Sequence, residues 1–434
     1  MPEVNRRDFL KQAGLATAGL ALQGGRALAQ ANRGEPVTAS PNEKVLVGII
    51  GVGRQGRLNA RGFASSNAGA EVVAICDVDR GYTEDVAKNV AELQPRPPRL
   101  EQDFRRLLDD KDIDALVIST PDHWHAIMTI MGCEAGKDIY VEKPACYNIE
   151  EGQAMVRAAR RYNRIVQVGS QQRSGTHYMD AVEYIRSGKL GTIGLVRAWV
   201  LTNRSNIGNP PDCDPPEGVD YDLWLGPAPL RPFNTNRLHY RWHWFWDYGT
   251  GEIGNWGAHN IDVALWALDL GLPKKVTATG GIRVLKDARE TPDTMVVTYE
   301  YPDLTLIWEH TQWSRRTLEG KAFGTAFYGS EGTLVIDRAG WEVIRKSRKE
   351  ESLKSGGSSL HPAHIANFIE CVRTRNRPNH DIAPGTLTAA HCHFGNISLR
   401  TGRSLYINRR EQRCIADYEA NTYLSRSYRK PWHL

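Results

Sequence analysis

In the first third of the chain, short apolar runs alternate with amphipathic stretches. The apolar runs predict strands over residues 44–51, 70–79, 114–120, 137–144 and 164–170. The amphipathic stretches predict helices over 54–64, 81–93, 123–135 and 149–162. Strands that alternate with helices predict a doubly wound parallel sheet, which is the Rossmann fold.

After about residue 171 the pattern changes. A helix is expected at 176–187 and a strand at 193–202, and a long insertion rich in proline and aromatic residues follows at 203–250. Neighbouring runs then predict antiparallel strands at 275–285, 294–301, 304–313, 324–330 and 332–338. Helices at 361–375 and 384–399 are expected to close this second domain.

These patterns predict an α/β protein with a domain boundary near residue 170. A Rossmann domain is expected over 44–170. An α+β domain with an open, mostly antiparallel sheet is expected over 171–410, and a C-terminal tail over 411–434.

The composition is that of an ordinary globular protein. The 434 residues are 41% hydrophobic and 24% charged, which is enough apolar material for two or three cores. The formal charge is +5, and the first 29 residues contribute four basic and two acidic side chains to it, which leaves +3. So small an excess argues against nucleic acid or an anionic membrane as the partner.

The first 29 residues are typical of a twin-arginine export signal. The run NRRDFLK holds an arginine pair, a mild apolar stretch follows, and ALA offers a cleavage site after Ala29, with Ala31 as the alternative. The apolar stretch is too short to span a bilayer permanently, so no membrane insertion is expected after cleavage. The sequence thus predicts the twin-arginine machinery as a partner, a periplasmic or otherwise exported location, and a polar linker at 30–43.

The cysteines and histidines do not predict a metal site. The seven cysteines are odd in number, widely spread and without a C-x-x-C pair, so we read them as buried small apolar residues, with one disulfide left open. His123 with His125 and His391 with His393 form H-x-H pairs, but neither has a third ligand at suitable spacing.

A glycine-rich motif marks the end of the first predicted strand. The motif is Gly51-Val52-Gly53-Arg54-Gln55-Gly56, and it opens the first predicted helix. In a dinucleotide site the first glycine permits the tight turn, the second lets backbone approach a pyrophosphate, and the third lets helix and strand pack closely. The helix N-terminus also favours the phosphate charge.

Asp77 strengthens this interpretation. It lies at the end of the second predicted strand, 21 residues beyond Gly56, where a carboxylate can accept hydrogen bonds from the adenosine ribose. A carboxylate there would repel a 2′-phosphate and favours NAD over NADP, whereas nearby Arg80 keeps NADP open.

Lys143 is a candidate general base. It follows Glu142 at the carboxyl end of a predicted parallel strand, where ligands of such sheets bind. A lysine desolvated beside the positive nicotinamide ring has reason to have a lowered pKa and to exchange a proton with a hydroxyl. A strand-end lysine that reaches out to water is the alternative.

The chain resembles the Gfo/Idh/MocA oxidoreductase family. The resemblance rests on GIIGVGRQG, TPDHWHA, EKP, GEIGNWGAHNID, GSEGTLVID and NISLRTGR, in that order along nearly all of the chain after the leader. It implies a Rossmann domain, a second domain whose open sheet often makes oligomer contacts, and hydride transfer between NAD(P) and a sugar or polyol carbon. It also implies that Lys143 is the catalytic lysine and that Thr120, Pro121, His125 and Glu142 line the nicotinamide side.

One position departs from the family pattern. The family usually has an aspartate four residues before the catalytic histidine, and here His259 matches the histidine whereas the other position is Asn255. Asparagine cannot take up a proton, but it can orient a substrate hydroxyl or cap a helix. The expected catalytic set is Lys143, His259 and Asn255, and a satisfied core histidine is the alternative for His259.

Further substrate-binding candidates lie nearby in the sequence. Gln171, Gln172 and Arg173 follow the last Rossmann strand and can bind substrate or hold the domains together. Asp262 can bind a sugar hydroxyl or restore negative charge near His259, or be a surface carboxylate. The aromatic residues of 241–249 suit stacking on a pyranose ring, although such clusters more often form loop cores.

These features predict an exported NAD(P)-dependent oxidoreductase of a carbohydrate or polyol. An enzyme outside the cytoplasmic nucleotide pool needs a tightly bound cofactor that is regenerated within the site. The second hypothesis is an NAD-dependent glycoside hydrolase or lyase that cycles its cofactor without net redox change. The third is a non-catalytic sugar- or NAD-binding protein.

Overall fold

The computed structural model describes residues 44–65, 69–347 and 352–434. The expected export signal and linker lie outside these residues. Among the helices of the described residues, none is both long and apolar enough to cross a membrane.

The first sheet confirms the Rossmann prediction. Six parallel strands lie in the order β3-β2-β1-β4-β5-β6. They are β1 (Val45–Ile50), β2 (Ala70–Cys76), β3 (Arg99–Glu101), β4 (Ala115–Ile118), β5 (Asp138–Val141) and β6 (Val166–Val168). The order reverses between β1 and β4, and ligands of such sheets bind in the crevice at this point, beyond the carboxyl ends of the strands.

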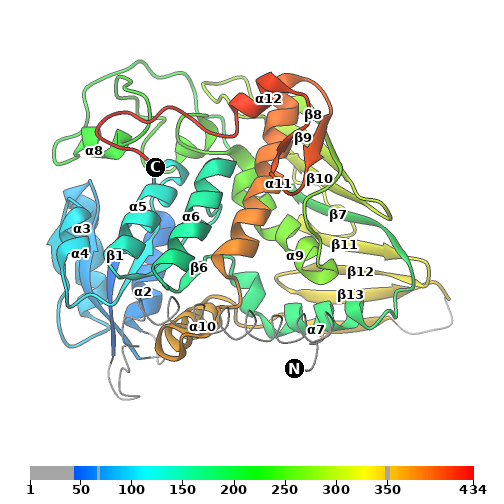
Figure 1. Cartoon of the computed structure of the whole chain (residues 1–434), viewed down its shortest axis with the longest axis horizontal. Coiled ribbons are helices and arrows are strands. Elements are labelled where there is room, and N and C mark those ends of the chain that lie inside the picture. Colours follow the sequence, from blue (N-terminus) through cyan, green and yellow to red (C-terminus); the bar gives the residue numbers. More distant parts are fainter. Residues whose placement is uncertain (1–43, 66–68, 348–351) are drawn as a thin grey trace, which may run out of the picture. The chain divides into compact units, whose positions relative to one another are not determined.

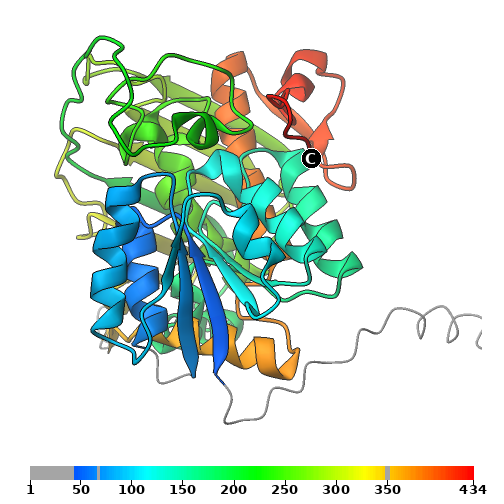
Figure 2. The same ribbon diagram turned by 90° about the vertical axis from the view of Figure 1, so that its left-hand side faces the viewer.

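Helices cover both faces of this sheet (Figure 2). They are α2 (Arg54–Ala64), α3 (Arg80–Ala91), α4 (Arg105–Asp109), α5 (Asp122–Glu134) and α6 (Ile149–Arg161). All four residues of β4 and of β5 are buried, as expected of strands covered on both sides. Asn148 caps α6 through the backbone N–H of Glu151, and acidic residues fill the first turn of that helix.

The second sheet has ten strands in the order β14-β13-β12-β11-β7-β10-β9-β8-β15-β16. They are β7 (Ile193–Leu201), β8 (Lys275–Gly281), β9 (Thr294–Glu300), β10 (Thr305–Thr311), β11 (Phe323–Gly329), β12 (Gly332–Asp337), β13 (Gly340–Arg345), β14 (Leu353–Gly356), β15 (Leu405–Asn408) and β16 (Arg413–Cys414). Neighbouring strands whose pairing is resolved run antiparallel except β7 and β10, which confirms a mostly antiparallel sheet. Buried and half-buried positions alternate along β9 and β10, so one face of the sheet forms a core.

Three helices contribute to that core on one side of the second sheet (Figure 1). They are α7 (Thr176–Arg186), α9 (Ala258–Leu268) and α11 (Ile382–Thr401). Their apolar side chains pack with Tyr299, Trp308 and Phe327 of the sheet. A 3-10 turn, η1 (Gln171–Ser174), precedes α7, and a π-helical turn, η3 (Ile253–Gly257), leads directly into α9.

One predicted helix forms, but its apolar side chains join the core of the first domain. We expected α10 (His361–Thr374) to close the second domain, but its Ile365, Phe368 and Ile369 belong to the core formed with β1 and α2. Phe368 contacts Phe63 and Tyr140 edge to face. The Rossmann sheet is therefore completed by a helix that follows the second domain's main strands in sequence (Figure 1).

The insertion at 203–250 reaches back over the Rossmann loops. The insertion contains α8 (Tyr221–Leu225) and the 3-10 turn η2 (Arg241–Trp244). A further short helix, α12 (Tyr418–Thr422), lies outside the insertion, in the C-terminal tail. The backbone N–H of Arg80 donates to the Gly218 carbonyl, and that of Asp220 donates to the Val78 carbonyl. The insertion is thus fastened to the loop after β2.

Candidate active site

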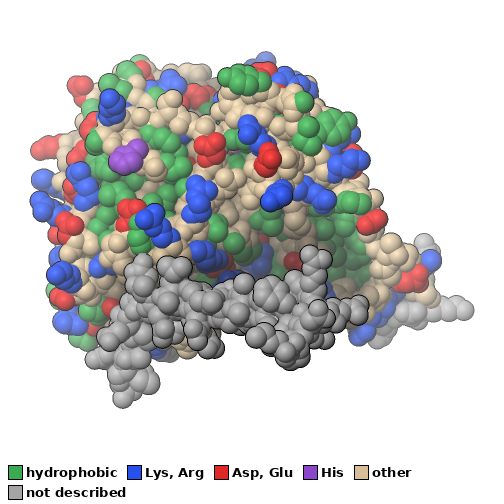
Figure 3. All heavy atoms as spheres, in the orientation of Figure 1, with side chains coloured by type: hydrophobic (Ala, Val, Ile, Leu, Met, Phe, Trp, Pro, Cys, Tyr) green, Lys and Arg blue, Asp and Glu red, His purple; other side chains and the backbone are tan. Residues whose placement is uncertain are grey.

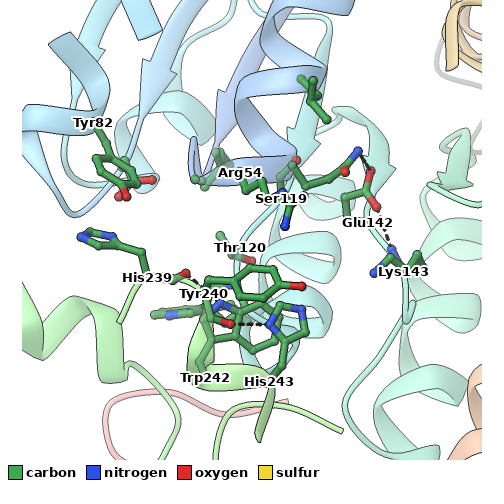
Figure 4. A pocket seen from close by; sticks show the side chains of 18 of the residues that line it. Arg54, Tyr82, Ser119, Thr120, Glu142, Lys143, His239, Tyr240, Trp242 and His243 are labelled. Atoms are coloured by element: carbon green, nitrogen blue, oxygen red, sulfur yellow. Dashed lines mark hydrogen bonds between the residues drawn. The ribbon is translucent and has the colours of Figure 1, made fainter. Parts of the chain in front are cut away.

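A cavity of about 420 Å³ lies at the crevice where the strand order reverses. Its walls come from the loops after β1, β2, β4 and β5, from the insertion, from η3 and α9, and from the turn between β12 and β13. Figure 4 shows residues of the Rossmann loops on one side and Tyr240, Trp242 and His243 of the insertion on the other, with Lys143 at one end.

The three glycines of the motif have the geometry that a dinucleotide site requires. Gly51 has a φ of +80°, and a Cβ there would lie 2.8 Å from the backbone of Thr120. A Cβ at Gly53 would meet nothing within 4 Å, so its backbone is open to a ligand. A Cβ at Gly56 would overlap the carbonyl oxygen of Gly51, so this position needs glycine for α2 to pack on β1.

Asp77 holds the turn together and also lines the cavity. Its two carboxylate oxygens accept hydrogen bonds from the backbone N–H groups of Val52, at 2.7 Å, and Asp79, at 3.0 Å. Burial raises the pKa of Asp77 to about 6, against the effect of these donors. Arg80, which kept NADP open, donates instead to the side chain of Gln102. These residues fit an adenosine ribose better than a 2′-phosphate.

Aromatic side chains of the insertion close the cavity above α2 and α3. The rings of Tyr82 and His239 stack with centroids 4.1 Å apart, and His239 Nε2 lies 3.2 Å from Asp79 (Figure 4). The guanidinium of Arg54 lies 5.5 Å from the centre of the Tyr240 ring. A dinucleotide in this cavity would be enclosed by two parts of the chain that are far apart in sequence.

Lys143 contacts Asn255 within the same cavity. Lys143 Nζ donates to Asn255 Oδ1 at 2.9 Å. Burial lowers the pKa of Lys143, and the charge of Glu142 opposes this effect. An amide oxygen accepts the ammonium hydrogen bond without adding a full negative charge, so Asn255 orients Lys143 while leaving the proton easier to remove than a carboxylate would.

Glu142 supports this wall of the cavity. It is 4% exposed, and its Oε1 accepts hydrogen bonds from Gln55, Asn59 and Gln171 at 3.1–3.3 Å. Burial raises its pKa, and the charge of Lys143 opposes that shift. Gln171 lines the cavity as well and also donates to the Tyr140 hydroxyl at 3.1 Å.

His259 lines the cavity. It is 5% exposed, and its Nδ1 has no hydrogen-bond partner among the described residues. Burial, followed by the charges of Arg338 and Lys143, lowers the pKa of His259 well below its usual value, so the ring is neutral at physiological pH. A neutral imidazole there can accept or donate one hydrogen bond to a ligand.

The prediction that Asn255 caps a helix is wrong. Asn255 lies inside η3, and the N-cap of α9 is Gly257, without a side-chain cap. The π-turn continues directly into α9, so the helix has no frayed N-terminus for Asn255 to satisfy at that position.

Arg173 and Asp262 bind each other and are not among the residues that line the cavity. Two guanidinium nitrogens donate to the two oxygens of Asp262, each at 2.8 Å, and Thr388 Oγ1 also donates to Asp262 at 2.8 Å. The side chain of Asp262 is fully buried, so the structure corrects two of the three expectations for this residue, a surface carboxylate and a group that faces a sugar. The third agrees with the structure, because the charge of Asp262 acts to raise the pKa of His259 against the effect of burial. Arg173 holds the start of α7 to α9.

The remaining nicotinamide-side residues divide into two groups. Thr120 and Pro121 line the cavity, and Thr120 Oγ1 is buried without a partner among the described residues. His125 lies behind them: its two ring nitrogens lie 2.8 Å from the Pro144 carbonyl and 2.9 Å from the Thr120 carbonyl, and the neutral ring donates to one of the two. His125 therefore positions the loops that carry Thr120 and Lys143.

Some residues of the aromatic segment 241–249 line the cavity, and others are buried without lining it. Trp242 and His243 line the cavity, whereas Trp244, Phe245 and Tyr248 lie in the core of the insertion.

All seven cysteines are free, and no three histidine, cysteine or acidic side chains of the described residues are grouped so as to hold a metal ion.

Several residues of the cavity were not identified from the sequence. Among them are Tyr82, Arg204, Tyr240 and Arg338. Arg204 and Tyr240 lie in the insertion, which has no periodic pattern, and Arg338 lies in the two-residue turn between β12 and β13. The sequence offered only a charged residue in a short turn as a signal for Arg338.

Two family models match the chain. The model described as the oxidoreductase family, NAD-binding Rossmann fold, matches residues 45–170. The model described as the oxidoreductase family, C-terminal alpha/beta domain, matches residues 199–322, and the two together cover more than half of the chain. The fold and the glycine-lined crevice define an NAD-binding oxidoreductase fold, and the chain belongs to the Gfo/Idh/MocA oxidoreductase family, as the motifs predicted.

Among curated proteins, the chain is similar to a glycosyl hydrolase family 109 protein of a Shewanella species, with 32% identity over 207 residues. It is similar to an alpha-N-acetylgalactosaminidase of Shewanella oneidensis, with 30% identity over 207 residues. Each match covers 44% of this chain and 45% of the relative, so the chain spans a little under half the length of these relatives.

Solved structures share the fold over most of the chain. The WlbA dehydrogenase from Bordetella pertussis, in complex with NADH and UDP-GlcNAcA, has a TM-score of 0.65 at 21% identity and covers 84% of this chain and 99% of its own. A levoglucosan dehydrogenase in complex with NADH and levoglucosan has a TM-score of 0.66 at 18% identity and covers 84% of this chain and 100% of its own.

Proposed function

We propose that this protein is an NAD-dependent oxidoreductase that acts on a carbohydrate or polyol and keeps its cofactor bound through turnover. The observation that carries the proposal is the hydrogen bond between Lys143 and Asn255 in the cavity that also contains the dinucleotide motif. Sugar dehydrogenases with the same fold, such as the levoglucosan dehydrogenase, support the choice of substrate class.

Different residues of the cavity bind the cofactor and transfer the proton. Gly51, Gly53 and Asp77 hold the adenosine and pyrophosphate parts of the dinucleotide, and Thr120 lies on the nicotinamide side. When bound, NAD supplies the hydride acceptor for oxidation of a carbon that bears a hydroxyl. Lys143 takes the proton of that hydroxyl, because its lowered pKa allows the neutral amine to form.

Two neighbouring side chains prepare Lys143 and the substrate. Asn255 fixes the direction of Lys143 Nζ through its amide oxygen. The His259 ring lines the cavity and is neutral, so it offers a hydrogen bond to a second substrate hydroxyl. The insertion excludes water from the cavity and limits the exit of the cofactor, because its Tyr240 and His239 contact Arg54 and Tyr82.

A second candidate function is favoured by the curated relatives. Proteins of glycosyl hydrolase family 109 at about one-third identity make a redox-neutral cleavage of a glycoside a specific alternative. Such a reaction would use the same base and the same enclosed cofactor. Export through the twin-arginine machinery stays a proposal for this chain, and an enclosed cofactor is compatible with it.

One preparation tests both candidates. The purified full chain is denatured, and released nucleotide is identified by mass spectrometry. The native protein is then mixed with free sugars, polyols and p-nitrophenyl α-N-acetylgalactosaminide. A rise in the near-ultraviolet absorbance of reduced nicotinamide with a free sugar or polyol supports the oxidoreductase. Release of nitrophenol without net reduction supports the glycosidase.

Lys143→Met is the matched control for both assays, since it removes the base while keeping the length of the side chain. Loss of either reaction in this variant with the nucleotide retained assigns the chemistry to this cavity. Absence of released nucleotide, together with no binding of added NAD or NADP, would contradict both candidates.

A further inference from the structure

The cavity contains one arginine whose role the proposed function does not explain. Arg338 lies in the two-residue turn between β12 and β13 and lines the cavity together with Asn255, Trp256 and His259. Its guanidinium carbon lies 5.0 Å from the centre of the Trp256 ring. Arg338 remains exposed to solvent, so it lies on the open side of the cavity.

Arg338 forms no ion pair or hydrogen bond with any described residue. Its neighbour Asp337 is engaged elsewhere, because Lys321 Nζ lies 3.0 Å from the Asp337 carboxylate. The Trp256 ring holds the guanidinium on one face and leaves its edge of N–H donors unoccupied. Such an edge matches a planar carboxylate or another small oxyanion.

The other cations of the cavity already have assignments. Arg204 is paired with the buried Glu252 at 2.8 Å. Arg54 belongs to the dinucleotide motif, and Lys143 is the base that contacts Asn255. Arg338 is therefore the lining cation left for the substrate.

The acidic side chains of the cavity do not balance Arg338. The lining carboxylates are Asp77, on the adenosine side, and Glu142, whose one negative charge acts on both Lys143 and Arg338 without a hydrogen bond to either side chain. Near Arg338, position 255 carries a neutral amide. The substrate end of the cavity thus has an excess of positive charge, which disfavours a cationic ligand and favours an anionic one.

The effect of Arg338 on its neighbours agrees with this geometry. After burial, the charge of Arg338 is the next cause that lowers the pKa of His259, and it also contributes to the lowered pKa of Lys143. On the face of the molecule drawn in Figure 3, basic and acidic side chains are interspersed over the described residues. The excess of positive charge is thus a local property of the substrate end of the cavity and not of that outer face.

We propose that the substrate carries an anionic group, a carboxylate in the first instance, and that Arg338 binds this group at the open side of the cavity. The inference rests on the proposed function, because it assigns a substrate class to the same cavity. It makes Arg338 a specificity-determining residue: a sugar acid is held with its anion on Arg338 and a hydroxyl toward Lys143 and His259.

Binding of matched probes tests the proposal without requiring turnover. The full chain with its bound nucleotide is titrated by calorimetry with D-galacturonate and D-galactose, and with D-glucuronate and D-glucose. Galactose 6-sulfate and galactose 6-phosphate form a third arm. A charge-assisted hydrogen bond at a partly exposed site predicts a Kd about tenfold lower for the acid than for the neutral sugar.

Two variants give the comparison its control. Arg338→Gln is expected to bring the Kd of the acid close to that of the neutral sugar, whereas Arg338→Lys retains part of the preference. Lys346→Gln removes a charge beyond the end of β13, where Lys346 lies 3.8 Å from Glu331 on the surface, and it is expected to leave the preference unchanged. The preference should also fall as salt is added, because the pair is exposed to solvent.

Each outcome decides the matter. A preference for the uronates that Arg338→Gln removes establishes a carboxylate site, and one confined to the sulfate or phosphate establishes an oxyanion site for an ester. Equal binding of acid and neutral sugar, or a preference that survives Arg338→Gln, overturns the inference. The proposed function fails by a different result, namely no change in the bound nicotinamide and no glycoside cleavage with any substrate.

Discussion

Buried Arg173 and half-buried Lys143 contact the same helical segment, and their surroundings differ in charge. Arg173 binds Asp262 through two hydrogen bonds of 2.8 Å, deep between α7 and α9. The side chain of Lys143 makes one hydrogen bond with a described residue, to the amide oxygen of Asn255 on η3, one π-turn before α9. The first arrangement stabilises the charges that it contains, and the second leaves the cation poorly stabilised.

The pKa shifts of these groups show the same difference. Burial alone would raise the pKa of Asp262, but the charges of Arg173 and His380 outweigh it, and the pKa lies well below its usual range. Burial lowers the pKa of Lys143, and no acid bound directly to Nζ compensates among the described residues. A permanent ion pair holds the helix in place, so that the lysine can remain ready to exchange a proton.

The largest expected effect is that of Lys143→Met. Loss of a general base should reduce turnover by about 10²- to 10⁴-fold. Nucleotide content and melting temperature should stay near those of the unaltered protein, because the ammonium makes one hydrogen bond. Steady-state rates and mass spectrometry check this expectation, and turnover within a factor of two would exclude Lys143 as the base.

Asp262→Ala should mainly affect stability. Removing one partner leaves Arg173 buried and uncompensated, which costs about 3–5 kcal/mol of unfolding free energy. Since the folded pKa of Asp262 is depressed, its contribution is present above the unfolded value of about 3.9 and is lost as the pH falls below it. Urea unfolding at neutral and acid pH measures both effects, and the variant should lose the acid-dependent part.

Asn255→Asp should make the surroundings of Lys143 resemble those of Arg173, because each cation would then contact a carboxylate. A carboxylate against Lys143 Nζ favours the charged amine, so the pKa of Lys143 should rise by about one unit or more. The base form is then reached at higher pH, and the ascending limb of the pH–rate profile should move upward by the same amount. An unchanged profile would show that Asn255 does not control the protonation of Lys143.

The smallest effect is expected for Trp266→Leu. The Arg173 guanidinium lies 5.1 Å from the centre of the Trp266 ring, and loss of this contact should cost roughly 1 kcal/mol. Turnover and its pH profile should not change, since Trp266 packs on the structural side of α9. A change in the pH profile would show that the two sites are coupled.

The regular parts of the fold could be predicted because their hydrophobic pattern is strong. The alternation in β9 and β10 and the buried runs of β4 and β5 place these elements to within a few residues. Strand β3 was not predicted, because its three residues, two of them charged, are mostly exposed and leave no apolar run. The insertion has no period, since its backbone follows an aromatic core of its own.

The residues of the candidate site that belong to sequence motifs could be predicted. The glycine motif, Asp77, Lys143 and His259 all line one cavity. The sequence also suggested Asp262 as a substrate-binding neighbour of His259, and it could not show that Arg173 would bind that carboxylate. Arg338 comes from a turn far along the chain, so only the folded structure brings it to the cavity.

The position of α10 has a consequence for how the chain is made. Phe368 and its neighbours cover the part of the first sheet that contains Tyr140 and packs on Phe63. A ribosome that has synthesised residues 44–170 has therefore produced a sheet with an unsealed apolar face, and that face is closed only when residues 361–374 emerge. The nucleotide-binding half can be completed only near the end of translation, and a fragment that stops at residue 170 would expose this core to water and to other chains.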